Sequence, residues 1–213
     1  MDAKIIDDLL SEKEILIFNN ITKDLEAPKD EYGNFIFDDQ DSYISVSKYL
    51  GRIQFNINNI GDLFPVKNLG LADKSLTIRL TKLANSISGL DLTLSSITYV
   101  EYSSRYGTPS LPPHYDGDNN DLIINYQFDS NTRWDLGVNF ETYEIKNNSA
   151  LVFNPNKTAH WRPNKIFNDG DFVKMIFFRF AKKENPTDYS DLQKFWPNDE
   201  VFKNICEFRN SLS

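Results

Sequence analysis

Residues 113–128 read Pro-His-Tyr-Asp-Gly-Asp-Asn-Asn-Asp-Leu-Ile-Ile-Asn-Tyr-Gln-Phe, and this stretch decides how the rest of the chain is interpreted. It opens with a His-Tyr-Asp triplet and runs on into a segment in which apolar and polar side chains alternate. In a strand, residues i and i+2 point to the same face, so His114 and Asp116 can hold one metal ion together. The triplet by itself is weak evidence, because it recurs by chance in many proteins.

The position of the second histidine strengthens this interpretation. The chain contains only two histidines, and His160 follows the apolar run from Ala150 to Phe153. Two histidines and one carboxylate on one face of an octahedron leave the other positions open, as in non-haem Fe(II) oxygenases. We therefore predict that His114, Asp116 and His160 bind iron and form the catalytic site. Zinc bound by the same three residues is the alternative, although the paired His or Cys spacing of usual zinc sites is missing.

Composition and charge narrow the class of protein. The chain has 213 residues and a formal net charge of −8, which suits one domain and disfavours non-specific nucleic-acid binding, because that binding needs clustered Lys and Arg. No apolar run approaches the length of a membrane span. One cysteine, Cys206, excludes an internal disulfide and fits a reducing compartment. Without a secretory signal, we expect a cytoplasmic protein that acts on a peptide or a small molecule.

The middle of the chain predicts a β-rich core. From Leu90 to Phe180, short apolar segments alternate with turn residues, which is typical of a sandwich or barrel. The predicted strands are Ser96–Tyr102, Pro113–Asp116, Leu122–Phe128, Gly137–Phe140, Thr142–Ile145, Ala150–Phe153 and Phe172–Phe180.

Helices are predicted on both sides of this core. A short helical stripe covers residues 5–10, and Ser11 with Glu14 has the spacing of a capping box. The clearest helix runs from Asp73, its expected cap, to Ser88, and Gly89 ends it.

The remaining segments complete the organisation. Alternating aromatic and polar residues over 31–55 predict two or three short strands, and Asn198 is expected to cap a C-terminal helix. We predict one compact domain with an N-terminal mixed α/β support region (1–89), a core (90–182) and a helical tail (183–213). The helices should cover one outer face of the core.

The last predicted strand carries a lysine among apolar side chains. Lys174 shares the even-numbered face with Phe172, Ile176, Phe178 and Phe180. The odd-numbered face has a charge at each end, so we expect the even-numbered face to point inward. An ammonium buried there needs a carboxylate partner. That partner is either the carboxylate of an organic acid bound in the pocket or a structural Asp or Glu. Alternatively, the Lys174 side chain extends along the strand so that its ammonium group reaches water.

Together, these motifs resemble the Fe(II)/2-oxoglutarate-dependent oxygenase superfamily, and most closely its prolyl-hydroxylase-like branch. The resemblance covers about residues 96–180. Its motifs are Tyr99-Val100-Glu101-Tyr102, His114-Tyr115-Asp116, Leu122 to Phe128, Trp134, Ala150 to Phe153, His160-Trp161-Arg162 and Lys174 to Phe178.

The resemblance implies a mainly β fold with flanking helices, whose core is a double-stranded β-helix (a jelly roll, cupin-like). It also implies that 2-oxoglutarate is the co-substrate and that a basic residue anchors its distal carboxylate with help from Tyr102. Lys174 is the expected anchor, and Arg162 is the alternative because it shares a face with His160. In that branch the basic residue is more often Arg and follows the second histidine more closely. An insertion-like loop, Asn164–Gly170, can account for the longer gap.

Three functional classes follow. The first is a dioxygenase that uses iron, 2-oxoglutarate and O2, with ascorbate as an additional cofactor, to hydroxylate an unactivated C–H bond and release succinate and CO2. Its expected substrate is a peptidyl or free amino acid. The second is a non-catalytic jelly-roll binding module, against which the intact ligand types argue. The third is a cupin-like metalloenzyme that does not use 2-oxoglutarate.

Overall fold

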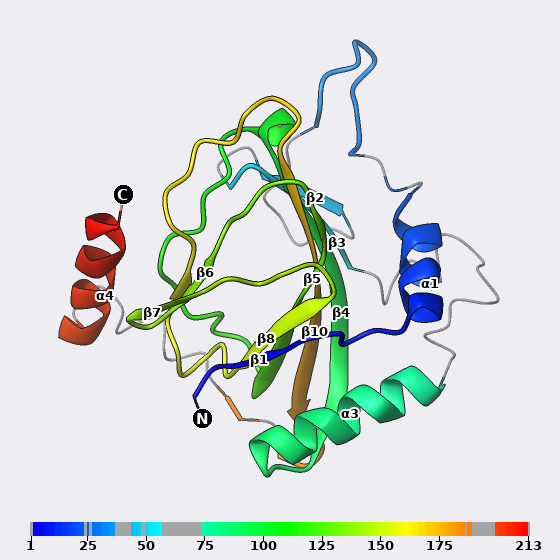
Figure 1. Ribbon diagram of the computed structural model, residues 1–213, viewed down its shortest axis with the longest axis vertical. Helices are drawn as coiled ribbons and strands as arrows, with labels where there is room; N and C mark the ends of the chain where they lie inside the picture. The colour runs from blue at the N-terminus through cyan, green and yellow to red at the C-terminus, as the bar shows by residue number, and fades with distance from the viewer. Residues whose placement is uncertain are drawn as a thin grey trace.

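Two antiparallel sheets form the core of the protein (Figure 1). The computed structural model describes residues 2–23, 25, 27–36, 44–47, 50–56, 74–185, 187–188 and 199–212. Among these, no helix is long and apolar enough to cross a membrane.

The larger sheet has seven strands in the order β1-β8-β5-β10-β4-β3-β2. Its longest strands, β4 and β10, pair antiparallel with each other, and β10 pairs with β5 on its other side. The bounds are β1 Lys4–Ile6, β2 Ile44–Ser47, β3 Arg52–Asn56, β4 Leu92–Ser103, β5 Leu122–Ser130, β8 Ser149–Phe153 and β10 Phe172–Lys182.

The smaller sheet consists of β7 (Glu141–Tyr143), β6 (Leu136–Val138) and β9 (His160–Trp161) in that order. It faces the inner side of the larger sheet across a buried apolar layer. That layer joins Trp134, Leu136, Val138 and Ile145 to side chains of β4, β5, β8 and β10. The predicted strand Pro113–Asp116 is reduced to one bridge, between His114 and His160.

Two helices cover the outer side of the larger sheet, α1 (Glu12–Thr22) and α3 (Lys74–Ser88) (Figure 1). The predicted capping box of α1 is confirmed, since Ser11 and Glu14 cap each other's backbone N–H groups. The predicted end of α3 at Gly89 is confirmed as well, with a φ of 69° that glycine adopts without strain; its expected cap, Asp73, lies outside the described residues. A short 3-10 helix, η2 (Ser104–Tyr106), follows β4.

Of two predictions for the N-terminal third, one is wrong and the other falls partly outside the described residues. The helical stripe over residues 5–10 is wrong, because Lys4–Ile6 form strand β1 and pair with β8. Tertiary pairing has overridden a local periodicity that is too short to specify a helix. Of the strands predicted over residues 31–55, β2 and β3 are present, and residues 37–43 and 48–49 lie outside the described residues.

The C-terminal helix α4 (Glu200–Ser211) lies on the opposite side of the core (Figure 1). Its Ile205 is buried against Ala159 and Trp161, next to the second histidine. The prediction that the helices share one outer face is therefore wrong for α4. The cap is Asp199, whose carboxylate accepts from the N–H of Val201, so the cap expected at Asn198 is shifted by one residue.

Strand β10 turns its odd-numbered face toward the smaller sheet. Val173, Met175 and Phe177 lie in the layer between the two sheets, whereas Ile176 and Phe178 pack under α1 and α3. The prediction that the even-numbered face points inward is wrong. The even-numbered face carries large apolar residues because α1 and α3 cover it. The sequence of the strand alone does not reveal this helical cover.

Candidate metal centre

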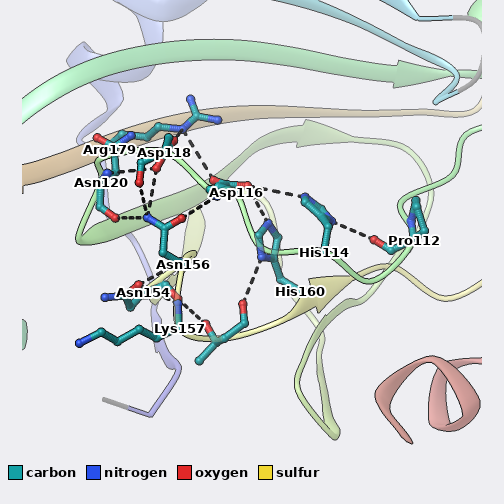
Figure 2. A network of polar contacts seen from close by, with 12 residues as sticks. Pro112, His114, Asp116, Asp118, Asn120, Asn154, Asn156, Lys157, His160 and Arg179 are labelled. Atoms are coloured by element: carbon teal, nitrogen blue, oxygen red, sulfur yellow. Dashed lines mark hydrogen bonds and ion pairs between the residues drawn. The ribbon is translucent and has the colours of Figure 1, made fainter. Parts of the chain in front are cut away.

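Local backbone pairing brings the two histidines together. His114 and His160 exchange both backbone hydrogen bonds, with N···O distances of 3.1 and 2.9 Å. Directly opposed residues of an antiparallel pair project to the same side, and their rings lie 4.1 Å apart between centroids. Asp116 is two residues after His114 and joins them on this side (Figure 2).

The three predicted ligands form a group that can hold one metal ion. One ligand atom from each lies within 4.8 Å of the others. Oδ1 of Asp116 is 3.6 Å from Nε2 of His114 and 3.2 Å from Nε2 of His160. Metal–ligand bonds of about 2.1 Å at right angles place neighbouring donor atoms about 3.0 Å apart, so small movements suffice for binding.

Backbone carbonyls fix the orientation of both imidazoles. Nδ1 of His114 lies 2.8 Å from the carbonyl oxygen of Pro112, and Nδ1 of His160 lies 3.4 Å from that of Thr158. A proton on each Nδ1 can be donated to these oxygens, which leaves the Nε2 lone pairs directed at the shared position.

Arg179 orients the carboxylate of Asp116 from the other side. Its Nε lies 4.0 Å from Oδ2 of Asp116 and 3.8 Å from Oδ2 of Asp118, and its Nη1 donates to Oγ1 of Thr98 at 2.8 Å. One oxygen of Asp116 therefore faces the histidines while the other faces a cation (Figure 2).

A buried asparagine holds the loop that follows Asp116. The side-chain oxygen of Asn156 accepts from the N–H of Gly117 at 2.7 Å. Its Nδ2 donates to the carbonyls of Asp118 and Asn120 at 2.9 and 2.6 Å. Asn156 is 1% exposed, so these bonds are shielded from water and fix the loop as one unit (Figure 2).

The electrostatics keep the ligands ready for a cation. Burial, assisted by the neighbouring His160, lowers the pKa of His114 to about 3, and Arg52 contributes to the lowering. Burial acts to raise the pKa of Asp116, but His160, Arg179 and His114 together hold it below its ordinary value. At neutral pH, His114 is therefore neutral and Asp116 ionised, as metal ligation requires.

Arg162 is an enclosed cation in the same interior. It is 1% exposed, its Nη1 donates to the carbonyl of Trp134, and its Nη2 lies 2.7 Å from the sulfur of Met175. Its Nε has no hydrogen-bond partner. Burial lowers its pKa to about 10. No carboxylate among the described residues pairs with it.

The other predicted co-substrate residues lie on opposite sides of the sheet. Tyr102 is on the inner side, 1% exposed, and its ring lies 6.0 Å from the Arg162 guanidinium. Lys174 is on the outer side, beside Phe172 and 3.7 Å from Asp129. Of the partners considered for Lys174, the structure therefore shows the structural carboxylate, Asp129. Lys174 does not face the triad.

The sequence did not single out Arg179, Asn125 or Asn156. Arg179 was assigned to an outer face, because a charge at the end of a strand usually meets water. Asn125 is on the inner side of β5, 4% exposed, with an unpartnered side-chain oxygen; the polar face of that strand was visible, but its direction was not. Asn156 lies in a turn between β8 and β9, where asparagine is common.

Comparisons with solved structures give consistent neighbours. The chain is similar to the non-heme alpha ketoglutarate dependent epimerase SnoN from nogalamycin biosynthesis, with a TM-score of 0.57 and 10% identity over 84% of this chain and 77% of that one. HygX from Streptomyces hygroscopicus, solved with nickel and 2-oxoglutarate bound, is similar with a TM-score of 0.54 and 9% identity, over 86% of this chain and 84% of that one. A prolyl hydroxylase in complex with a hypoxia inducible factor peptide fragment from Trichoplax adhaerens is similar with a TM-score of 0.51 and 13% identity, over 84% of this chain and 83% of that one.

No protein-family model matches this sequence, and no curated protein matches it either. At identities this low, a structural likeness establishes the fold alone. The predicted core is confirmed: two facing antiparallel sheets carry a His-Asp-His group between them. The chain therefore has the double-stranded β-helix fold of its structural neighbours, which also include an oxidoreductase of the 2OG-Fe(II) oxygenase family from Burkholderia pseudomallei.

Proposed function

We propose that this protein is a non-haem Fe(II)- and 2-oxoglutarate-dependent dioxygenase that hydroxylates an unactivated C–H bond of a peptidyl or free amino acid. The reaction consumes 2-oxoglutarate and O2 and releases succinate and CO2. One oxygen atom enters succinate and the other enters the substrate as a hydroxyl group, so atoms and electrons balance.

The observation that carries the proposal is the pairing of the triad with an enclosed, unpaired arginine. His114, Asp116 and His160 offer two imidazoles and one carboxylate, the donor set of non-haem Fe(II) oxygenases. Bound iron would supply open coordination positions for 2-oxoglutarate and O2, together with the redox chemistry of hydroxylation.

Arg162 fits the distal carboxylate of 2-oxoglutarate. A buried guanidinium with an unpartnered Nε costs free energy unless an anion meets it. A dicarboxylate that binds the metal at one end supplies that anion at the other. Tyr102 lies against the same guanidinium and is placed to support the carboxylate.

The protein's own groups then have separate tasks. Asp116, oriented by Arg179, and the two histidines hold the ion; Arg162 orients the co-substrate; and the apolar side chains of the layer exclude water. Val138, Leu151 and Phe153, each at most 4% exposed, belong to this layer. Charge interactions are stronger where water is excluded.

Succinate release tests this proposal. Protein supplied with Fe(II), 2-oxoglutarate and ascorbate is expected to form succinate, and amino acids, peptides and oligonucleotides are compared as stimulants. His160→Ala removes one of three protein ligands and should abolish turnover while circular dichroism still reports a folded β protein.

Two results would contradict the proposal. If His160→Ala turns over 2-oxoglutarate like the wild type, the triad is not the iron site. If the wild type binds Zn(II) tightly but never consumes 2-oxoglutarate with Fe(II), the protein belongs to the metalloenzymes that do not use this co-substrate. Stimulation by oligonucleotides alone would refute the amino-acid substrate class.

A further inference from the structure

We propose that Arg52 binds a carboxylate of the primary substrate, so that the enzyme acts on a free amino acid or similar small carboxylic acid. This inference rests on the function proposed above and narrows its substrate class. Arg52 belongs to β3, in the N-terminal third that the sequence resemblance does not cover.

Strand register places Arg52 on the inner side of the larger sheet. In the antiparallel ladder between β3 and β4, Arg52 is directly opposite Tyr102, and directly opposed residues share a face. Its Nη1 donates to the Tyr102 hydroxyl at 3.3 Å. The neighbouring Ile53 is 1% exposed and packs on the outer side with the helices.

Hydrogen bonds tie the start of β3 to the segment that carries the first ligand. The N–H of Ser110 donates to the carbonyl of Leu50 at 3.2 Å, and the N–H of Arg162 donates to the carbonyl of Leu111 at 2.9 Å. Residues 110–111, three to four residues before His114, thus connect the start of β3 to the strand of His160.

The approach between these segments is tight at Gly51. A Cβ at this position would lie 2.4 Å from the backbone nitrogen of Pro109, and the φ of Gly51 is 58°. Glycine meets both demands, a left-handed backbone and close contact. The backbone immediately before Arg52 is therefore held against Pro109, five residues before His114.

Arg52 has no carboxylate partner in the described part of the chain. The two other inner arginines are already accounted for: Arg179 faces Asp116 and Asp118, and the enclosed Arg162 is proposed to meet 2-oxoglutarate. Fe(II), Arg162 and Arg179 balance the charges of Asp116, Asp118 and the co-substrate dianion. Arg52 then adds a positive charge that only a further anion neutralises.

Accessibility separates the roles of Arg52 and Arg162. Arg162 is 1% exposed, whereas Arg52 is half-buried and lies at the first position of its strand. A molecule that arrives from solvent after the co-substrate meets Arg52 first. The next inner position of β3 is Gln54, also half-buried, whose amide can donate to the same ligand.

Matched acids and amides test the proposal. The twenty free amino acids and a set of short carboxylic acids are assayed as stimulants of succinate release, and each acid is compared with its own carboxamide. In at least one pair, the acid should stimulate succinate release and the carboxamide should not. A charge-assisted hydrogen bond lost in Arg52→Met should raise the KM of that acid about ten- to a hundredfold, and Arg52→Lys should recover part of the loss.

Direct binding separates this inference from the proposed function. Calorimetry on protein loaded with Zn(II) and 2-oxoglutarate measures the affinity for each acid and its amide without turnover. The expected control is Arg105→Met, because Arg105 pairs with Glu101 on the outer side. If Arg52→Met weakens 2-oxoglutarate instead of the acid, or if amides and end-blocked peptides bind as well as acids, the proposal is wrong. If acids bind but Fe(II) gives no succinate, only the proposed function fails.

Discussion

At the scale of single residues, the site is defined by which charges have partners. Arg179 forms ion pairs with Asp116 and Asp118, and Lys174 forms one with Asp129. Within the part of the chain that the structure describes, the Arg162 guanidinium contacts a carbonyl, a sulfur and two aromatic rings but no carboxylate. A buried charge without a partner of opposite sign costs several kcal/mol of folding free energy, which an anionic ligand would offset. For this reason, the proposed function assigns the co-substrate carboxylate to Arg162 and not to Lys174, the lysine of the last strand.

The first prediction compares these two cations. Arg162→Met preserves length but removes the charge, and a charge-assisted bond contributes about 1.5–3 kcal/mol, so 2-oxoglutarate affinity should fall by roughly one to two powers of ten. Lys174→Met is the matched control and should leave affinity within about twofold. Titration of 2-oxoglutarate into metal-loaded protein measures both, and the reverse order would restore Lys174 as the anchor.

The sequence identified the metal-ligand candidates, but it did not show to which face of the sheet a side chain points. His114, Asp116 and His160 were identifiable because a chain with two histidines offers few ways to build the motif, and the structure brings them together. The inner face of β10 was not identifiable. Both faces of that strand are apolar because one packs on helices and the other on the smaller sheet, so alternation carries no direction.

At the scale of elements, α4 supports the ligand-bearing segments from outside. The Phe202 ring lies 5.9 Å from that of Tyr115, which stands between His114 and Asp116 in sequence. The Phe208 ring lies 6.0 Å from that of Trp161, which follows His160. Both ligand segments therefore rest on one helix.

A second prediction follows from this packing. Ile205 is fully buried under α4, and truncating such a side chain costs about 2–5 kcal/mol. Ile205→Ala should lower the urea midpoint and also weaken metal binding, because Tyr115 and Trp161 lose their support. Val201 on the same helix is 54% exposed, so Val201→Ala should change neither quantity appreciably. Equal effects of the two substitutions would show that α4 does not support the site.

Element boundaries also show where local sequence signals are sufficient. The capping box at Ser11 and the glycine end of α3 were predictable because each depends on a few neighbouring residues. The strand at Lys4–Ile6 was not, since its partner β8 is nearly 150 residues away. Pairing over that separation leaves no local periodicity to recognise.

At the scale of the whole molecule, a metal ion would link parts of the chain that fold from distant segments. His160 belongs to the smaller sheet, and Arg179, which orients Asp116, belongs to the larger one. Binding only to the folded state stabilises it by mass action. The two facing sheets and the ion should therefore form one cooperative unit rather than two.

The short strand β1 has a consequence for solubility. It covers β8, a strand whose five residues are all buried. Without β1, the backbone donors and acceptors of an apolar strand would be open to other chains, a common origin of edge-to-edge aggregation. Removing residues 1–7 should therefore produce concentration-dependent light scattering, whereas removing only residues 1–3 should not. Equal scattering from both truncations would show that β1 does not protect the sheet. If only the longer truncation scatters, β1 prevents self-association of the protein and has no part in metal binding.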